Sequence, residues 1–181
     1  MTDPIAIWHA EHVYFSKLLR LLQKQIDVFH TGERPNYELM LDVVTYLREY
    51  SDRFHHPRED VAFERLARHC PDLELVLARL QQEHRVIARA GAELLDHLQA
   101  ALEDAIVPRE RIESAAATYL VYYGSHIARE ENAVLSRAAQ HLTPEDWGAV
   151  RDAAPLVPDP LFGADPDERF RKLRRLIALE S

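Results

Sequence analysis

The sequence predicts an all-α protein, an up-down-up-down four-helix bundle with a C-terminal helical extension. Of its 181 residues, 47% are hydrophobic, 29% are charged and only five are glycine, which is typical of a helical globular domain. Long segments repeat apolar residues at intervals of three and four, and short breaks with proline or glycine separate them. We expect the bundle over residues 1–150 and a proline-containing connector with a last helix over residues 151–181.

The first two helices have clear start and break signals. Asp3 and Pro4 open the first helix, because Asp accepts hydrogen bonds from free backbone N–H groups and proline in the first turn gives up none. This helix is expected to end near His30, and residues 31–35 read as a loop. The second helix carries Pro57 in its interior. Since proline removes one helical hydrogen bond, we expect a bend there.

The remaining helices are placed by prolines and capping residues. After a break at Cys70 and Pro71, Asp72 is expected to cap the third helix, and the fourth begins after Pro108. Thr143 then caps a short helix. A stiff connector follows, which contains Pro155, Pro158 and Pro160.

The last helix starts at Asp165 or Asp167 and carries an apolar stripe. We expect it to pack on the outside of the bundle, on a partner protein or on a second copy of the chain in a homodimer.

Composition excludes several classes of function. A formal net charge of -8 and a pI near 5.7 argue against nucleic acid as a partner, because nucleic-acid-binding surfaces are usually basic. The sequence contains no apolar run long enough to span a membrane. Cys70 is the only cysteine and cannot form an internal disulfide, and the N-terminus lacks a secretion signal. We therefore expect a cytoplasmic protein.

Four histidines fall at one height in the predicted bundle. An α-helix rises about 1.5 Å per residue, so His12 lies about 27 Å before the end of the first helix, and His55 returns to nearly that height on the second. The same count places His84 and His126 at this level to within about one turn. Each histidine alone is more commonly a hydrogen-bonded core residue. Their joint placement on inward faces favours a metal site.

Two glutamates complete this set of candidate ligands. Glu59 follows His55 by four residues, and Glu130 follows His126 by four, so each pair shares a helical face. Four imidazoles and two carboxylates supply enough donors for two metal ions if both carboxylates bridge. Imidazole with carboxylate oxygen suits iron, manganese or zinc.

Four stretches of this sequence resemble the hemerythrin-like, or HHE cation-binding, domain family over roughly residues 3–150. They are Ala10-Glu11-His12, Phe54 to Asp60, Gln82-Glu83-His84 and His126 to Glu131. The resemblance implies a four-helix bundle that holds two iron ions in an oxo- or hydroxo-bridged, non-haem centre. The implied metal ligands are His12, His55, Glu59, His84, His126 and Glu130. The implied function is to bind or sense a small ligand (dioxygen, nitric oxide or peroxide) or iron itself.

The sequence departs from the oxygen-carrying hemerythrins at two positions. Ala88 stands four residues after His84, where those carriers have a fifth histidine, and Glu130 stands where they have Asp. These departures weigh against a plain oxygen carrier. They favour family members associated with iron sensing, with the response to nitric oxide or peroxide, or with iron–sulfur cluster repair. The missing histidine is expected to leave an open coordination position.

Neighbouring residues and other functions remain open alternatives. His9 replaces His12 if the first helix is rotated. His56 and Asp60 repeat the spacing of His55 and Glu59 but point about 100° away, so we expect them beside the site or facing solvent. The chain is more readily a binding protein than an enzyme. The alternatives are a di-iron peroxidase or oxidase and a metal-free helical interaction module.

Overall fold

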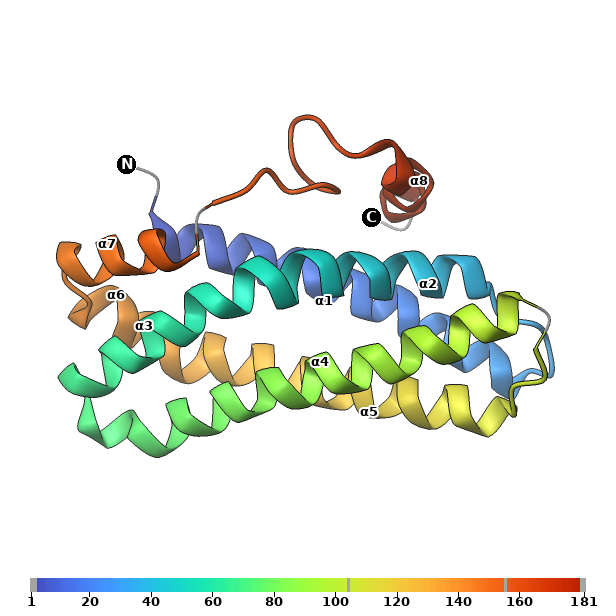
Figure 1. The fold of residues 1–181 in the computed structure, drawn as a ribbon, viewed down its shortest axis with the longest axis horizontal. Coiled ribbons are helices and arrows are strands. Elements are labelled where there is room, and N and C mark those ends of the chain that lie inside the picture. Colours follow the sequence, from blue (N-terminus) through green and yellow to red (C-terminus); the bar gives the residue numbers. More distant parts are fainter. Residues whose placement is uncertain (1–2, 104, 155, 180–181) are drawn as a thin grey trace.

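The computed structural model describes residues 3–103, 105–154 and 156–179. Four long helical rods lie side by side, and Figure 1 shows consecutive rods running in alternating directions. Within the described residues there is no strand, which confirms the all-α class. The α-helices in chain order are α1 (Pro4–His30), α2 (Tyr37–Tyr46), α3 (His56–His69), α4 (Glu74–Leu102), α5 (Arg109–Arg129), α6 (Leu135–His141), α7 (Pro144–Ala153) and α8 (Arg171–Leu179).

The starts of the first two helices follow from side-chain caps. The Asp3 carboxylate accepts a hydrogen bond from the backbone N–H of Ile5 at 3.0 Å, as the sequence predicts for α1. α2 is capped by Asn36, whose side-chain oxygen accepts from the N–H of Leu39 at 3.0 Å. Both caps fix where the chain enters the bundle.

The predicted bend beside Pro57 is a π-helical segment, Leu47–His55, which joins α2 to α3 without a break in the rod. A proline ring crowds the carbonyl one turn before it, and the wider π turn gives that carbonyl room. Next to it, the carbonyl of Phe54 accepts a hydrogen bond from Nε of Arg58 at 2.8 Å. A second π-helical segment, Glu130–Val134, joins α5 to α6. Both π segments therefore lie next to predicted ligands.

The prediction that Asp72 caps the third helix is wrong. A short 3₁₀ turn, Pro71–Leu73, precedes α4, and α4 has no side-chain cap. The Asp72 carboxylate instead accepts a hydrogen bond from Arg137 at 3.0 Å. Asp72 thus ties the start of α4 to α6 rather than satisfying backbone N–H groups.

Two hydrophobic clusters fill the bundle on either side of a polar layer. The larger cluster is built from all four rods and includes Phe15, Leu22, Val44, Leu94 and Tyr119. The smaller cluster lies at the end of the bundle that α7 covers and includes Trp8, Phe63, Leu66, Leu80 and Val134. Cys70 is a buried member of the smaller cluster, as expected for a structural thiol. These clusters hold the rods in register around the layer between them.

The C-terminal part packs back on the bundle. α7 begins with a capping box between Thr143 and Asp146. α8 lies against α1 and α2 (Figure 1). Its residue Leu173 and Phe170, which ends the 3₁₀ turn Glu168–Phe170 before it, are buried in the larger cluster. Pro155, expected in the connector, lies outside the described residues. The division into two parts at residue 150 stays a prediction.

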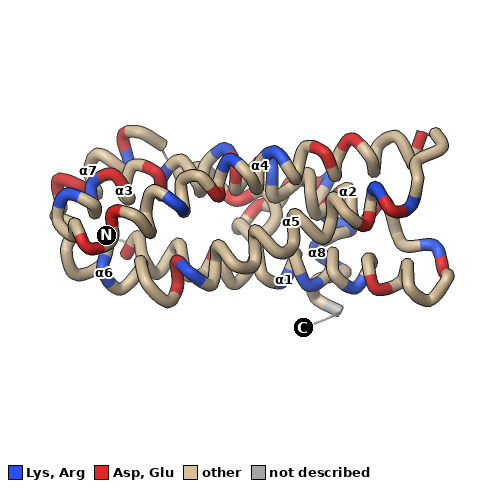
Figure 2. Tube along the Cα trace, turned by 90° about the horizontal axis from the view of Figure 1, so that it is seen from below, with Lys and Arg blue, Asp and Glu red and all other residues tan. Residues whose placement is uncertain are grey.

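Acidic and basic residues are interspersed along the rods (Figure 2). No helix in the described part of the chain combines the length and the apolar character that a membrane span requires.

Candidate metal centre

The structure brings all six predicted ligands together in the middle of the bundle. Each of these side chains is buried, with a residue exposure of 5% or less. They come from all four rods, and we call them the central layer: His12, His55, Glu59, His84, His126 and Glu130.

One histidine pair of the central layer, His12 and His55, joins α1 to the second rod. Their Nε2 atoms lie 3.1 Å apart. Oε1 of Glu59 lies 3.0 Å from Nε2 of His55 and 3.3 Å from Nε2 of His12. Oε2 of Glu130 approaches the same His12 nitrogen at 3.4 Å. Two imidazoles and two carboxylates thus converge on one point.

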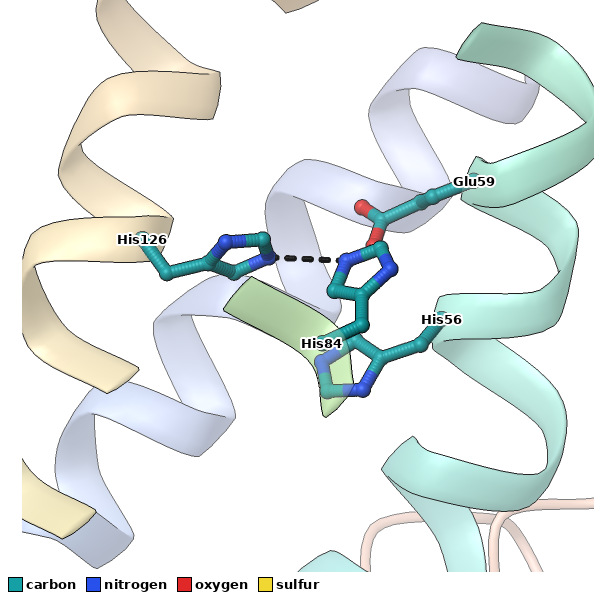
Figure 3. A group of neighbouring side chains, drawn as sticks. All are labelled: His56, Glu59, His84 and His126. Carbon is teal, nitrogen blue, oxygen red and sulfur yellow. Dashed lines mark hydrogen bonds and ion pairs between the residues drawn. The ribbon is translucent and has the colours of Figure 1, made fainter. Parts of the chain in front are cut away.

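The other histidine pair, His84 and His126, repeats this arrangement between α4 and α5. Their Nε2 atoms lie 2.9 Å apart and face one another (Figure 3). Oε1 of Glu130 lies 3.0 Å from Nε2 of His126, and Oε2 of Glu59 lies 3.5 Å from Nε2 of His84. Each glutamate therefore presents one oxygen to the first histidine pair and its other oxygen to the second.

A carboxylate holds the outer nitrogen of every histidine in the central layer. The Nδ1–H group of each ring donates to an acidic side chain, so its Nε2 atom points inward with a free lone pair. The four contacts are His12 to Glu131 at 2.7 Å, His55 to Glu11 at 2.7 Å, His84 to Asp60 at 2.8 Å and His126 to Glu83 at 3.3 Å.

We call these four acids the outer carboxylates. The sequence predicted only Asp60 beside the site or facing solvent, and it did not predict a role for Glu11, Glu83 or Glu131. Each one adjoins a central-layer residue in sequence but serves a histidine on another rod. Glu11 precedes His12, for example, and its carboxylate holds His55. An acidic residue directly beside four of the six predicted ligands is the signal in the sequence. The pairing itself depends on how the rods pack.

Arginines neutralise two of the outer carboxylates. Arg58 is buried and donates from one terminal nitrogen to both oxygens of Glu11 at 2.9 and 3.1 Å. The Tyr50 hydroxyl also donates to Glu11, at 2.8 Å. On the opposite side of the centre, Arg129 donates to Glu83 at 2.6 Å. These contacts fix both carboxylates and, through them, two imidazole rings.

Electrostatics in the central layer raise the pKa of His12, His55 and His84 and lower the pKa of Glu59 and Glu130. Burial favours the neutral ring of His12, but the hydrogen bond to Glu131 and the adjacent carboxylate of Glu59 outweigh it and raise its pKa to about 10. In the same way, Asp60 and Glu130 outweigh burial and raise the pKa of His84 to about 11. Burial opposes the charged form of Glu59, yet the neighbouring histidines hold its pKa well below the ordinary value. Bound positive charge, from protons or metal ions, therefore stabilises the central layer.

The donor set of the central layer fits a pair of metal ions. All four carboxylate oxygens of Glu59 and Glu130 are buried, and none accepts a hydrogen bond from the described residues. Buried carboxylates without such partners are costly unless a cation compensates them. Two Nε2 lone pairs about 3 Å apart also repel each other unless a proton or a metal ion lies between them. Imidazole and carboxylate ligands of this kind suit iron, manganese and zinc.

The residues left as alternatives take other positions. His9 does not replace His12: its side chain is 63% exposed, and Nδ1 contacts Glu131 at 2.9 Å. Asp60 lies beside the centre, as expected, and holds His84. His56 is buried rather than solvent-facing, because the π segment before it breaks the regular turn of 100° per residue. Burial and the nearby His84 lower the pKa of His56 well below its ordinary value.

Comparison with known families identifies the bundle. The family described as hemerythrin HHE cation-binding domain matches residues 3–138. The chain belongs to the hemerythrin HHE cation-binding domain family. The match extends into all four rods and includes every residue of the central layer, so this is a helical, cation-binding protein of the hemerythrin type. A search of curated proteins finds no match. Beyond the family, the assignment of metal and ligand rests on the site itself.

Proposed function

We propose that this hemerythrin-like protein binds two iron ions in the central layer and there binds or senses a small ligand such as dioxygen, nitric oxide or peroxide. The observation that carries the proposal is the placement of Glu59 and Glu130, each of which directs its two oxygens at two different histidine pairs. A carboxylate in that position bridges two cations. A single ion would leave one histidine pair and two carboxylate oxygens without a partner.

The roles of the residues follow from their positions. His12 and His55 would hold one ion, His84 and His126 the other, and the two glutamates would bridge them. The iron pair, when bound, supplies reversible redox change and a coordination position for an external ligand. The outer carboxylates orient each imidazole and make its Nε2 atom a stronger donor. The two hydrophobic clusters keep bulk water from the layer.

A hollow on the surface supports access for a small molecule. This hollow, of about 230 Å³, lies between α1 and the α5 rod, with His9 and Glu131 at its rim. His12, otherwise buried, forms part of its lining together with Val13 and Ile127. Diatomic molecules and peroxide are small enough to enter this hollow, where His12 is the one central-layer residue in the lining.

Metal analysis of the purified protein tests the proposal. We expect two iron ions per chain after anaerobic loading with iron(II) and removal of free metal. A His55→Ala with His126→Ala double variant should lose most of this iron, because it removes one ligand from each pair. A His30→Ala with His97→Ala double variant removes two histidines outside the layer and should keep both ions.

Two further observations decide the outcome. Absorption spectra of the loaded protein should change on addition of dioxygen, nitric oxide or peroxide, and each change should be absent from the double variant. Rapid consumption of peroxide with turnover would favour the enzyme alternative instead. A wild-type protein that binds no iron, or a double variant that binds as much as the control, would overturn the proposal.

A further inference from the structure

A cavity of about 270 Å³ lies outside the central layer, between α1, α3 and α7. α7 packs against α3 next to the start of α1 (Figure 1). The lining includes the buried side chains of Trp8 on α1 and Arg58 on α3, and also Leu156, which follows α7 and is 56% exposed. The cavity therefore has a buried floor and a rim that solvent reaches.

The walls of this cavity are largely apolar and aromatic. Trp8 and Trp147 meet edge-on with 5.4 Å between ring centroids, and Ile7, Val150 and Ala154 extend the apolar surface. An apolar cavity of about 150 Å³ is enough to bind benzene. With about 270 Å³, this cavity has room for one aromatic ring that carries a short side chain.

The charged residues in the lining are two arginines, Arg58 and Arg151, and no described residue of the lining is acidic. Arg151 lies on α7 and is exposed, and it forms no hydrogen bond or ion pair with other residues of the described ranges. A cation of this kind at the rim attracts an anion from solvent. The charge of the lining therefore selects a negatively charged ligand.

Arg58 presents a hydrogen-bond donor in a fixed orientation. Its Nε atom donates to the carbonyl of Phe54 at 2.8 Å, and its Nη2 atom donates to both oxygens of Glu11 at 2.9 and 3.1 Å. Nη1 takes part in no hydrogen bond with the residues that the structure describes. Because this arginine lines the cavity and is held on two sides, Nη1 is the donor left for a bound carboxylate.

We propose that this cavity binds a small aromatic carboxylic acid, a single ring with a short acidic side chain. The ring packs against Trp8 and Trp147, and the carboxylate accepts a hydrogen bond from Nη1 of Arg58 and is attracted by Arg151. A neutral analogue gains only the apolar contacts, and a cationic one is repelled by both arginines. The proposal does not depend on iron, since no residue of the lining belongs to the central layer.

Tryptophan fluorescence and calorimetry test the proposal, with phenylacetate as the probe. The chain has two tryptophans and both line the cavity, so their emission reports on its contents. We expect saturable binding of phenylacetate with a Kd below about 1 mM. The neutral isostere phenylacetamide and the cation phenethylamine should bind at least about 10-fold more weakly, because each lacks the charge-assisted hydrogen bond to Arg58.

Four variants locate the ligand. Arg151→Gln should weaken phenylacetate about 2- to 5-fold, as expected for an exposed charge pair, and leave phenylacetamide unchanged. Arg58→Lys keeps a positive charge beside Glu11 but loses the planar fork, so phenylacetate should weaken about 10-fold and phenylacetamide should again be unchanged. Ala154→Phe fills the cavity and should abolish binding of both. Arg89→Gln removes an exposed arginine outside the cavity and is the matched control.

Three results would each overturn the proposal. The first is no saturable binding of phenylacetate, and the second is binding of phenylacetamide or phenethylamine as tight as that of phenylacetate. The third is undiminished binding in folded Ala154→Phe, which would place the carboxylate elsewhere, for example on iron. Circular dichroism checks folding, and the exposed Arg151→Gln decides the question if the other variants do not fold. Iron content is measured separately, so failure here leaves the proposed function standing, and the reverse.

Discussion

Replacement of Glu11 by Gln tests two roles of an outer carboxylate: it orients a histidine of the central layer, and it neutralises a buried arginine. Glu11 holds Nδ1 of His55 at 2.7 Å and also accepts from Tyr50 and Arg58. An amide has nearly the same shape but carries no charge, and it has one carbonyl oxygen where the carboxylate has two acceptors. We therefore expect weaker orientation of His55 and a buried guanidinium without its counterion.

The structure sets the size of both effects. The Arg58 side chain is only 4% exposed, so its charge cannot be rehydrated without local opening. Breaking such a buried pair costs about 3–5 kcal/mol of unfolding free energy, and for a domain of this size that lowers the melting temperature by about 6–20 °C. Loss of a partner to a metal-binding histidine weakens metal affinity by about 10–100-fold, or about 1.4–2.8 kcal/mol.

Glu83→Gln is the matched control for the loss of unfolding free energy expected in Glu11→Gln. Glu83 holds His126 as Glu11 holds His55, but its arginine partners are more exposed, at 27% for Arg129 and 68% for Arg79. Water can solvate these guanidinium groups, so the stability cost falls to about 1 kcal/mol, while the loss of metal affinity stays the same.

Two assays measure the change in stability and the change in metal affinity separately. Thermal and denaturant unfolding of metal-free protein, followed by circular dichroism, gives the stability, and chelator competition gives the metal affinity. Equal destabilisation by Glu11→Gln and Glu83→Gln would refute the argument from the burial of Arg58. Wild-type metal affinity in both variants would refute the role of the outer carboxylates.

Three other predictions follow from the fold and the charges. Gly91→Ala places a Cβ atom 2.9 Å from the buried Tyr119 ring and should lower the free energy of unfolding by about 1–3 kcal/mol. The Cβ atom of Gly124→Ala meets nothing within 4 Å, so this variant should stabilise α5 by about 0.5–1 kcal/mol. Urea unfolding measures both changes, and destabilisation by both variants would contradict the packing argument. Thr143→Ala removes the capping box of α7 and should cost about 1 kcal/mol, seen as earlier unfolding, while an unchanged midpoint would show that packing alone holds this helix. Metal-free protein should lose stability as pH rises, because the pKa of His12 is about 10 when folded and about 6.5 when unfolded: its contribution is complete below pH 6.5 and disappears toward pH 10. If the melting temperature of chelator-treated protein stays constant or rises between pH 6.5 and pH 10, this pH prediction is contradicted. Iron affinity should show the opposite trend and increase with pH.

The heights of the ligands were predictable because the rise of a helix is nearly constant. Counting along the rods placed His12 level with His55 and His84 level with His126, and the structure brings the Nε2 atoms of each pair to 3.1 and 2.9 Å. The start of α1 was predictable because the cap is local: Asp3 bonds a backbone N–H two residues away. Asp72 failed as a cap because a distant residue, Arg137, competes for its carboxylate.

The directions of consecutive side chains were not predictable in the same way. The expectation that only one of His55 and His56 faces inward assumes a regular α-helix. The segment before Pro57 is π-helical, so consecutive side chains are not spaced by the α-helical 100°, and the rings of His55 and His56 are both buried. The outer carboxylates escaped prediction for a related reason. Glu11 and Glu131 are visible in the sequence beside ligands, but which histidine each one holds depends on packing between rods.

The charges around the central layer explain why it suits two divalent cations. Two glutamates and four outer carboxylates bring six negative charges, and their two least exposed arginine partners, Arg58 and Arg129, return two positive ones; Arg79, the other partner of Glu83, is 68% exposed and is left to solvent. Four positive charges are still needed if the histidines are neutral. Two divalent ions supply them, and protons on the histidines are the alternative when metal is absent. Metal ions and protons therefore compete to neutralise the same buried carboxylates. The layer lies between two hydrophobic clusters, where unneutralised negative charge is costly. A site of this kind links metal binding, pH and stability through the same few side chains.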